Sequence, residues 1–150
     1  METTFKIPEN SDTETLVELI REFHEFEHLP FDDNTIATVL AKLLNNDSLG
    51  RLWLIQHGSE AIGYIVLTFG YSLEFLGRDA FIDELYIRES YRGQGIGRSA
   101  IKFVESACPE LGVQAVHLEV DRKNTAAQSL YRQVGFQDHE RYLMTKWLAT

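Results

Sequence analysis

The sequence is poor in cysteine and proline, and it has no long apolar run. It contains one cysteine, Cys108, and 3 prolines in 150 residues. A single cysteine excludes an internal disulfide framework and a cysteine-rich metal site, and it is typical of proteins in the reducing cytosol. No apolar run approaches the roughly 20 residues that a membrane-spanning helix needs. The start, Met1 to Lys6, lacks the basic residues and apolar stretch of a secretory signal. We therefore expect a cytoplasmic protein with no membrane partner.

Basic residues are also in the minority. The chain has 14 lysines and arginines against 23 acidic residues, for a formal net charge of −9. Binding to nucleic acid needs a basic face that neutralises phosphates, so we expect no nucleic-acid partner. An acidic protein is compatible with a cationic small substrate, because acidic clefts concentrate positive ligands. The charge can equally serve only to keep the protein soluble.

No repeat, low-complexity tract or proline-rich linker divides the chain, so residues 1–150 are expected to form one domain. The first half predicts two helices and a hairpin. Ser11 and Glu14 form a candidate capping box for a helix over residues 11–28. A second helix starts at Asp32 or Asp33 and ends near residues 45–46, and its apolar side carries Ile36, Val39, Leu40, Leu43 and Leu44. Residues 52–55 and 61–69 form the hairpin around a His57-Gly58 turn.

The second half alternates strands and helices. Strands are expected over residues 80–87, 115–120 and 142–147, and helices over residues 95–111 and 125–134. Gly112 and Gly135 follow the two helices and are expected to end them. Antiparallel strands followed by alternating strands and helices indicate an α/β or α+β fold with a mixed sheet.

The most informative stretch is the glycine-rich turn over residues 91–98, Tyr-Arg-Gly-Gln-Gly-Ile-Gly-Arg, between a strand and a helix. Its alternating glycines let bare N–H groups approach a ligand, and the helix start adds positive potential. Such a turn can hold a pyrophosphate, with Arg92 or Arg98 adding a charged contact. It has neither the Gly-Lys-Ser/Thr of a Walker loop nor the Rossmann spacing. The alternative is that the glycines only make a tight turn.

Three blocks together resemble the GNAT acetyltransferases. Residues 92–97 match the signature Q/R-x-x-G-x-G/A, residues 82–87 resemble the strand before it, and residues 124–136 resemble the family's second coenzyme-side helix. The resemblance implies a mixed, mostly antiparallel sheet with helices on both faces, and acetyl-CoA as co-substrate without a metal. It implies that N–H groups of the turn hold the pyrophosphate, that the strand edge pairs with the pantetheine arm, and that Asn124 contacts this arm. The implied coenzyme-binding set is Leu85, Tyr86, Ile87, Arg92, Gly93, Gln94, Gly95, Ile96, Gly97, Arg98, Asn124, Ala127 and Tyr131.

Acetyl transfer to an amine needs a neutral amine, a polarised thioester carbonyl and a proton for the leaving thiolate. The resemblance places Tyr131 near the sulfur, where its phenol can supply that proton as general acid. A backbone N–H of the 80–87 strand can polarise the carbonyl. Alternatively, Tyr131 is a core residue whose ring is buried and whose hydroxyl reaches solvent.

A carboxylate is the candidate base that takes the ammonium proton. Asp83 and Glu84 are neighbours on a strand, so we expect them to point to opposite faces. The resemblance to polyamine and diamine acetyltransferases places the functional carboxylate at Asp83, with Glu84 as the second choice. Either can instead bond only to neighbouring chain. His117 lies in mid-strand, where a structural role is expected.

Two rival classes remain open. Residues 24–28, His-Glu-Phe-Glu-His, satisfy the H-E-x-x-H pattern of zinc hydrolases. Glu27 adds a charge inside that pattern, Pro30 follows closely, and no third ligand stands out. The other rival is a non-catalytic module that binds acetyl-CoA. It stays open because the residues expected to bind the coenzyme differ from those expected to carry out the chemistry.

The acceptor is expected to be a cationic amine. Acidic residues gather between the first two helices and before the central strand: Glu22, Glu25, Glu27, Asp32, Asp33, Glu74 and Asp79. They suit a polyamine, a diamine or a lysine-like amino acid, while an aminoglycoside or a protein amine stays open. We also expect a homodimer, because an apolar strand over residues 142–147 would otherwise leave an exposed edge.

Overall fold

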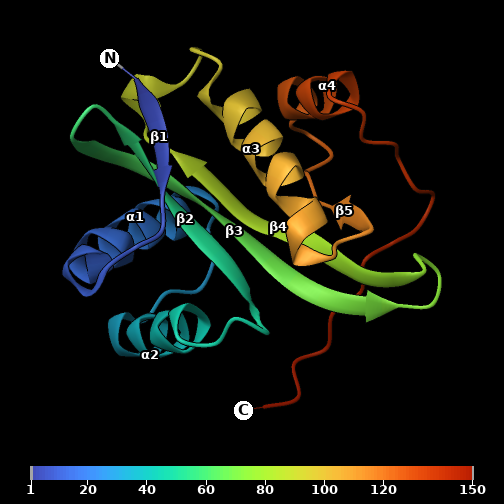
Figure 1. Cartoon of the computed structure of the whole chain (residues 1–150), viewed down its shortest axis with the longest axis horizontal. Helices are drawn as coiled ribbons and strands as arrows, with labels where there is room; N and C mark the ends of the chain where they lie inside the picture. Colours follow the sequence, from blue (N-terminus) through green and yellow to red (C-terminus); the bar gives the residue numbers. More distant parts are fainter. Residues whose placement is uncertain (1, 150) are drawn as a thin grey trace. The chain divides into compact units, whose positions relative to one another are not determined.

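The computed structural model describes residues 2–149, and the chain divides into two compact units between Glu119 and Val120. The first unit is built on a five-stranded sheet in the order β1-β2-β3-β4-β5 (Figure 1). The first three neighbouring pairs are antiparallel and the last pair, β4 with β5, is parallel. The predicted mixed, mostly antiparallel sheet is therefore confirmed. The strands are β1 Thr3–Lys6, β2 Gly50–His57, β3 Glu60–Ser72, β4 Gly77–Ile87 and β5 Ala115–His117.

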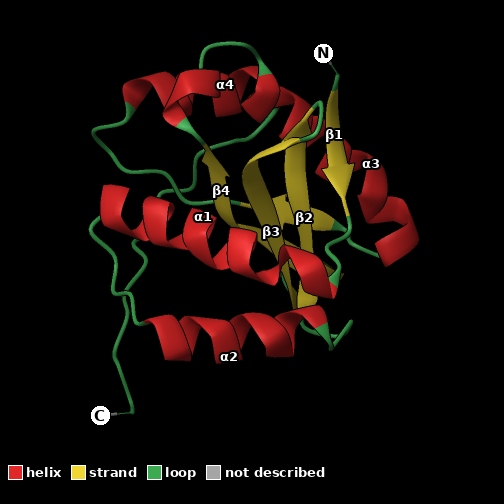
Figure 2. Cartoon of the chain, turned by 90° about the vertical axis from the view of Figure 1, so that its left-hand side faces the viewer, coloured by secondary structure: helices red, strands yellow, loops and turns green. Residues whose placement is uncertain are grey.

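Helices cover both faces of this sheet. Side chains alternate between the faces along a strand, so Leu52 and Leu54 of β2 share one face while Trp53 lies on the other. The helices α1 (Thr13–Phe26) and α2 (Asp33–Leu44) pack on the Leu52 face, and Figure 2 shows them side by side. The helix α3 (Ile96–Leu111) packs on the opposite face, where the Phe103 ring lies 5.2 Å from the Trp53 ring. The sheet is thus the middle layer of a three-layer unit.

The first helix differs from the sequence prediction at both ends. Residues Asn10–Asp12 form a short 3-10 helix, and α1 begins at Thr13. The predicted Ser11–Glu14 capping box is wrong, because the Asp12 carboxylate instead accepts a 2.8 Å hydrogen bond from the Glu9 N–H. The helix ends at Phe26 because the chain turns into a left-handed conformation at His28, with φ of 57°.

The remaining elements of the first unit largely follow their predicted ranges. Asp32 caps α2 by accepting a 2.9 Å hydrogen bond from the Thr35 N–H, as the sequence predicts. Val39 was expected on the buried side of α2 but is 59% exposed. Gly112 ends α3 in a left-handed conformation, as predicted, whereas β5 stops three residues early at His117. The sequence patterns do not predict β1, which pairs with β2 from about fifty residues away, nor the two short 3-10 turns.

The second unit contains one helix, α4 (Thr125–Gln133), which ends before Gly135 at φ of 105°. The strand predicted over residues 142–147 is wrong. A strand forms only where a neighbour satisfies its backbone groups, and no described residue pairs with this segment. Its large apolar side chains are exposed: Tyr142, Leu143, Met144, Trp147 and Leu148. Within residues 2–149, no helix is long and apolar enough to cross a membrane.

Candidate active site

The glycine-rich turn joins the end of β4 to the start of α3. After Ile87 the chain forms a short 3-10 turn, Glu89–Tyr91, and α3 begins at Ile96. Gly93 and Gly95 are left-handed, with φ of 77° and 80°, and a Cβ on either would meet no heavy atom within 4 Å. The turn therefore needs glycine for its backbone conformation, and the space beside it is open.

This open turn fits a pyrophosphate. The N–H groups in the first turn of a helix have no partner inside the helix, and here they add to the positive end of the α3 dipole. Arg98 is the third residue of α3, and Arg92 precedes the first left-handed glycine. The Arg92 Nε donates a 2.7 Å hydrogen bond to the Ile87 carbonyl, and its guanidinium lies 4.8 Å from the Phe26 ring centroid. Its positive charge is thereby fixed beside the turn.

The strand before the turn has an open edge. On one side β4 pairs with β3 from Gly77 to Ile87 with one interruption at Asp83, but on the other side β5 pairs only with Asp79, Ala80 and Phe81. Among the described strands of the first unit, none pairs with residues 82–87 on that second side. This edge of β4 over residues 82–87 is therefore open to an extended ligand arm, although the Ile87 carbonyl already accepts the bond from Arg92.

A β-bulge interrupts β4 at the predicted carboxylates. The register pairs Val66 with Glu84 and Leu67 with Ile82, so Asp83 has no partner in β3. Such a bulge breaks the regular alternation of side chains, so the expectation that Asp83 and Glu84 point to opposite faces stays a prediction. Asp83 is exposed and Glu84 is half-buried, and the charge of His24 acts on both.

Each oxygen of the Glu84 carboxyl group has a hydrogen-bond partner. The distances given are between heavy atoms. The Tyr64 hydroxyl donates a 2.8 Å hydrogen bond to Glu84 Oε1, and His24 Nε2 lies 2.8 Å from Glu84 Oε2. The other ring nitrogen, His24 Nδ1, lies 2.9 Å from the Pro30 carbonyl oxygen. Burial raises the pKa of Glu84, although the bonds from Tyr64 and His24 oppose that rise. Burial and the adjacent Glu84 carboxylate raise the pKa of Tyr64, so its hydroxyl remains a donor.

Asp83 is the more open carboxyl of the two. The protein around it removes water and raises its pKa, while the nearby His24 acts in the opposite direction. A carboxylate with a raised pKa is a better proton acceptor near neutral pH than an ordinary one. The site therefore contains two carboxyls suited to acid–base work, and they differ in exposure and in partners.

The acidic residues predicted to surround the acceptor are mostly engaged elsewhere. Glu22 accepts hydrogen bonds from the Tyr86 hydroxyl at 2.9 Å and from Arg88 at 3.0 and 3.1 Å. Burial and the bond to Glu22 raise the pKa of Tyr86 to about 12. Asp32 caps α2, and Asp33 forms an ion pair with Arg21. These carboxylates stabilise the first unit, which leaves fewer of them for a polycationic ligand than the composition suggests.

Comparison with known proteins identifies the family. A family model for the acetyltransferase (GNAT) family matches residues 13–136. The chain belongs to the GNAT acetyltransferase family. The bovine thialysine N-epsilon-acetyltransferase is 29% identical over 140 residues, which are 85% of this chain and 79% of that protein. A D-amino-acid N-acetyltransferase of Saccharomyces cerevisiae is 28% identical over 135 residues, which are 87% of this chain and 83% of that protein.

Solved structures agree with the GNAT fold. An integron cassette protein from a salt-marsh metagenome matches with a TM-score of 0.86 and 33% identity, over 97% of this chain and 91% of the other. An aminoglycoside N-acetyltransferase in complex with CoA matches with a TM-score of 0.83 over 99% of this chain and 96% of the other. At 15% identity that likeness concerns the fold alone. The predicted family, fold and enzyme class are thus confirmed: this GNAT protein is an N-acetyltransferase.

The second unit of this GNAT chain carries the other predicted site residues. Asn124 precedes α4 and its side-chain oxygen accepts a 3.1 Å hydrogen bond from the Ala127 N–H, so both residues form the helix cap. Tyr131 lies two turns later, partly exposed, with its ring 6.1 Å from the Phe136 ring. Their roles toward the coenzyme remain predictions.

The H-E-x-x-H pattern does not form the geometry of a zinc site. His28 lies beyond the end of α1 in a left-handed conformation, so it does not share a helix face with His24. Both ring nitrogens of His24 are already hydrogen-bonded to protein oxygens. Among residues 2–149 there is no group of three or more side chains placed to bind a metal ion. The other candidate histidine, His117, pairs with Asp79 at 3.0 Å, and its ring contacts the rings of Phe75 and Phe81.

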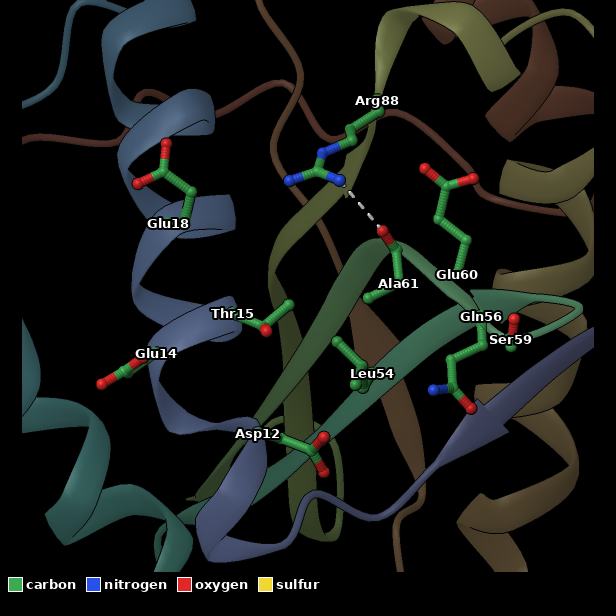
Figure 3. A pocket seen from close by; sticks show the side chains of 10 residues that line it. All are labelled: Asp12, Glu14, Thr15, Glu18, Leu54, Gln56, Ser59, Glu60, Ala61 and Arg88. Atoms are coloured by element: carbon green, nitrogen blue, oxygen red, sulfur yellow. Dashed lines mark hydrogen bonds between the residues drawn. The ribbon is translucent and has the colours of Figure 1, made fainter.

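A separate open pocket of about 500 Å³ lies between the start of α1 and the β2–β3 hairpin (Figure 3). None of the predicted site residues lines it. Three of its four acidic lining residues have protein partners: Asp12 pairs with Lys6, Glu18 with Arg21 and Glu60 with the Tyr91 hydroxyl. The dashed line in Figure 3 marks the bond from Arg88 to the Ala61 carbonyl, at 3.2 Å. This pocket is therefore distinct from the candidate active site.

Proposed function

We propose that this GNAT enzyme transfers the acetyl group of acetyl-CoA to the primary amine of a small cationic acceptor. The observation that carries the proposal is the pair of carboxyls with raised pKa at the β4 bulge, next to an open strand edge and the glycine turn. A base beside a coenzyme seat is what amine acetylation requires. The match to thialysine N-epsilon-acetyltransferases, whose named substrate carries a side-chain amine, supports such an acceptor.

Among cationic acceptors, a lysine-like amino acid is favoured over a polyamine. A polyamine carries several charges along its length and needs several free carboxylates. Here Glu22, Asp32 and Asp33 are bonded to other protein groups. The exposed carboxyl of Asp83 at the bulge suits an acceptor whose reacting end carries one positive charge.

In the proposed mechanism each site residue acts on a defined atom. N–H groups of residues 93–97 bind the pyrophosphate, and the open edge of β4 aligns the pantetheine arm, which delivers the acetyl group as a thioester. Asp83 accepts a proton from the acceptor ammonium, directly or through water, and the neutral amine attacks the thioester carbonyl carbon. Tyr131 donates its hydroxyl proton to the sulfur as the carbon–sulfur bond breaks. The nitrogen passes its second proton, directly or through water, to the Tyr131 phenolate as the amide forms, and the proton on Asp83 leaves to solvent. This mechanism requires the two units to work as one acetyltransferase domain over residues 1–150.

We also propose that the enzyme is a cytoplasmic homodimer. The free, buried Cys108 is consistent with a reducing compartment. The exposed apolar side chains over residues 142–148 would be covered if this segment paired with a second copy.

A panel of amines with acetyl-CoA, followed by release of the coenzyme thiol, tests the acceptor class. The panel comprises lysine, thialysine, a diamine, a polyamine, a neutral monoamine, an aminoglycoside and a peptide. We expect lysine or thialysine to give the highest kcat/KM, at least about tenfold above the neutral monoamine. A highest value for the aminoglycoside or the peptide would contradict the proposal. Coenzyme binding without turnover on any amine would instead identify a non-catalytic binding module.

A further inference from the structure

His24 occupies a central position that the H-E-x-x-H pattern does not explain. It lies near the end of α1, and its ring bridges two other segments: Nδ1 faces the Pro30 carbonyl and Nε2 faces Glu84 of β4. Its side chain is 12% exposed, and Phe23 and Phe31 contact the ring by their edges. His24 therefore ties the loop between α1 and α2 to the bulged centre of β4.

The partners of His24 fix where its protons lie. A carbonyl oxygen only accepts hydrogen bonds, so the 2.9 Å contact to Pro30 requires a proton on Nδ1. The 2.8 Å contact between Nε2 and Glu84 Oε2 also requires a proton, because two lone pairs at this distance would repel each other. That proton belongs either to the imidazole or to the carboxyl. In both cases the His24–Glu84 pair holds one shared proton and is neutral as a whole.

This shared proton determines the charge next to Asp83. With the pair neutral, Asp83 can ionise without an uncompensated negative charge on the adjacent residue. Without His24, an ionised Glu84 would act on Asp83 as a neighbouring like charge, which makes ionisation of Asp83 harder. Glu84 itself is committed, since Tyr64 binds one of its oxygens and His24 the other.

We propose that His24 is a positioning residue for acceptor deprotonation: it shares a proton with Glu84, ties that carboxyl to the α1–α2 loop at Pro30, and leaves Asp83 as the carboxylate that accepts the proton of the acceptor amine. This assignment rests on the acetyl transfer proposed above. It also explains why the first histidine of the H-E-x-x-H pattern is largely buried and bonded while His28 is exposed.

The other charged and titratable groups around this site are already paired or more distant. Beyond Asp83 and Glu84, the groups that face the site are Glu22 from α1, Tyr64 from β3, Tyr86 from β4, Arg88 directly after β4, and Arg92 from the glycine turn. Glu22 is compensated by Arg88, and Tyr64 and Tyr86 have raised pKa values because of burial and their carboxylate partners. The charge balance at Asp83 therefore depends chiefly on the His24–Glu84 pair.

The decisive experiment is the pH dependence of kcat/KM for the best acceptor in the parent, His24→Gln, Glu84→Gln and the double variant. Glutamine at position 24 can donate a hydrogen bond but cannot become positive. We expect His24→Gln to move the acidic limb upward by about 0.5–1 pH unit, because Glu84 is left uncompensated. In the double variant Glu84 is also neutral, so the limb should return towards the parent position. His28→Asn, at the exposed second histidine, is the matched control and should leave the profile unchanged.

Several results would overturn the proposal. One is an acidic limb that does not move in His24→Gln. Another is a fall in the kcat/KM of His24→Gln by the same factor at every pH. The third is a double variant whose acidic limb stays at the shifted pH. If His24→Gln does not fold, Glu84→Gln decides: loss of turnover at every pH would make Glu84 the base and refute the role of Asp83.

An NMR measurement separates this inference from the proposed function, because it needs no acceptor. In long-range ¹H–¹⁵N spectra of the parent, His24 should carry a proton on Nδ1, and its Nε2 resonance should change in Glu84→Gln. A bare Nδ1, or identical Nε2 resonances in the two proteins, would refute the shared proton even in an active enzyme. An inactive parent with the expected His24 spectra would refute the acetyl transfer but not the His24–Glu84 pair.

Discussion

The two adjacent carboxyls of β4 have different surroundings, and the roles proposed for them rest on this difference. Glu84 is half-buried and bonded through both oxygens, whereas Asp83 sits on the bulge and is exposed. Burial raises the pKa of both, so each prefers a proton more strongly than a free carboxyl does. The exposed member is the one that a soluble amine can reach.

Asp83→Asn should remove the base without changing the size of the side chain. Asp83 must be ionised to accept a proton, so the parent rate is lost as the pH falls through the raised pKa of this carboxyl. In the variant the rate should follow the fraction of neutral acceptor, which moves the acidic limb upward towards the pKa of the amine. We expect a fall of about 100-fold at neutral pH that shrinks as the pH rises. A pH–rate profile equal to that of the parent would exclude Asp83 as the base.

Tyr131→Phe tests the general acid. Phenylalanine keeps the ring and its contact with Phe136, so an effect on rate reports chemistry and not collapse of α4. A hydroxyl that protonates the leaving thiolate acts only in the transition state, so kcat should fall by about 10- to 1000-fold with KM nearly unchanged. Steady-state kinetics at saturating acetyl-CoA give both constants. Turnover at the parental rate with intact coenzyme binding would assign the proton to another donor.

At the scale of elements, the turn between β4 and α3 is where local conformation and ligand binding coincide. Gly95→Ala should place a Cβ in the open space beside the first turn of α3 and strain a left-handed residue by about 1–2 kcal/mol. Gly112→Ala is the matched control, because Gly112 is left-handed at the other end of the same helix and also has open space around it. Both variants should lose similar thermal stability.

Only the Gly95 variant should lose coenzyme affinity, by about tenfold or more when measured by isothermal titration calorimetry. Equal coenzyme affinities for Gly95→Ala and Gly112→Ala would show that the turn does not bind the pyrophosphate.

The sequence predicts most elements of the first unit because their signals are local. Asp32 before α2, Gly112 after α3 and the apolar run over residues 61–69 each encode their element within a few residues. The four-residue β1 depends on pairing with β2 far along the chain, and a sequence pattern does not show that partner. The expected last strand failed for the same reason, because apolar alternation without a partner does not make a strand.

The site shows the same division between local and distant information. The glycine turn and the Asp83–Glu84 pair are visible as motifs, so they could be predicted. The bulge at Asp83 arises from the pairing of β4 with β3, and the bond between His24 and Glu84 joins residues sixty positions apart, so no local pattern encodes either. The H-E-x-x-H pattern did mark His24, but it indicated the wrong chemistry.

At the scale of the whole molecule, the exposed apolar segment near the C-terminus predicts self-association. Sedimentation velocity at micromolar protein should show a dimer, and a chain that ends at residue 141 should sediment as a monomer. The apolar side chains removed in that variant are exposed in the single chain, so their loss should not disturb the core of the first unit. A monomer in the full-length sample would refute the dimer.

The most direct test of the proposed acetyl transfer follows the acetyl group itself. Acetyl-CoA carrying an isotopically labelled acetyl group is incubated with the enzyme and a lysine-like acceptor, and mass spectrometry follows the label. We predict one labelled acetyl on the acceptor amine for each coenzyme thiol released, and none with an enzyme that carries Asp83→Asn and Tyr131→Phe together. Thiol release without a labelled amine, or coenzyme binding without any release, would contradict transfer to an amine.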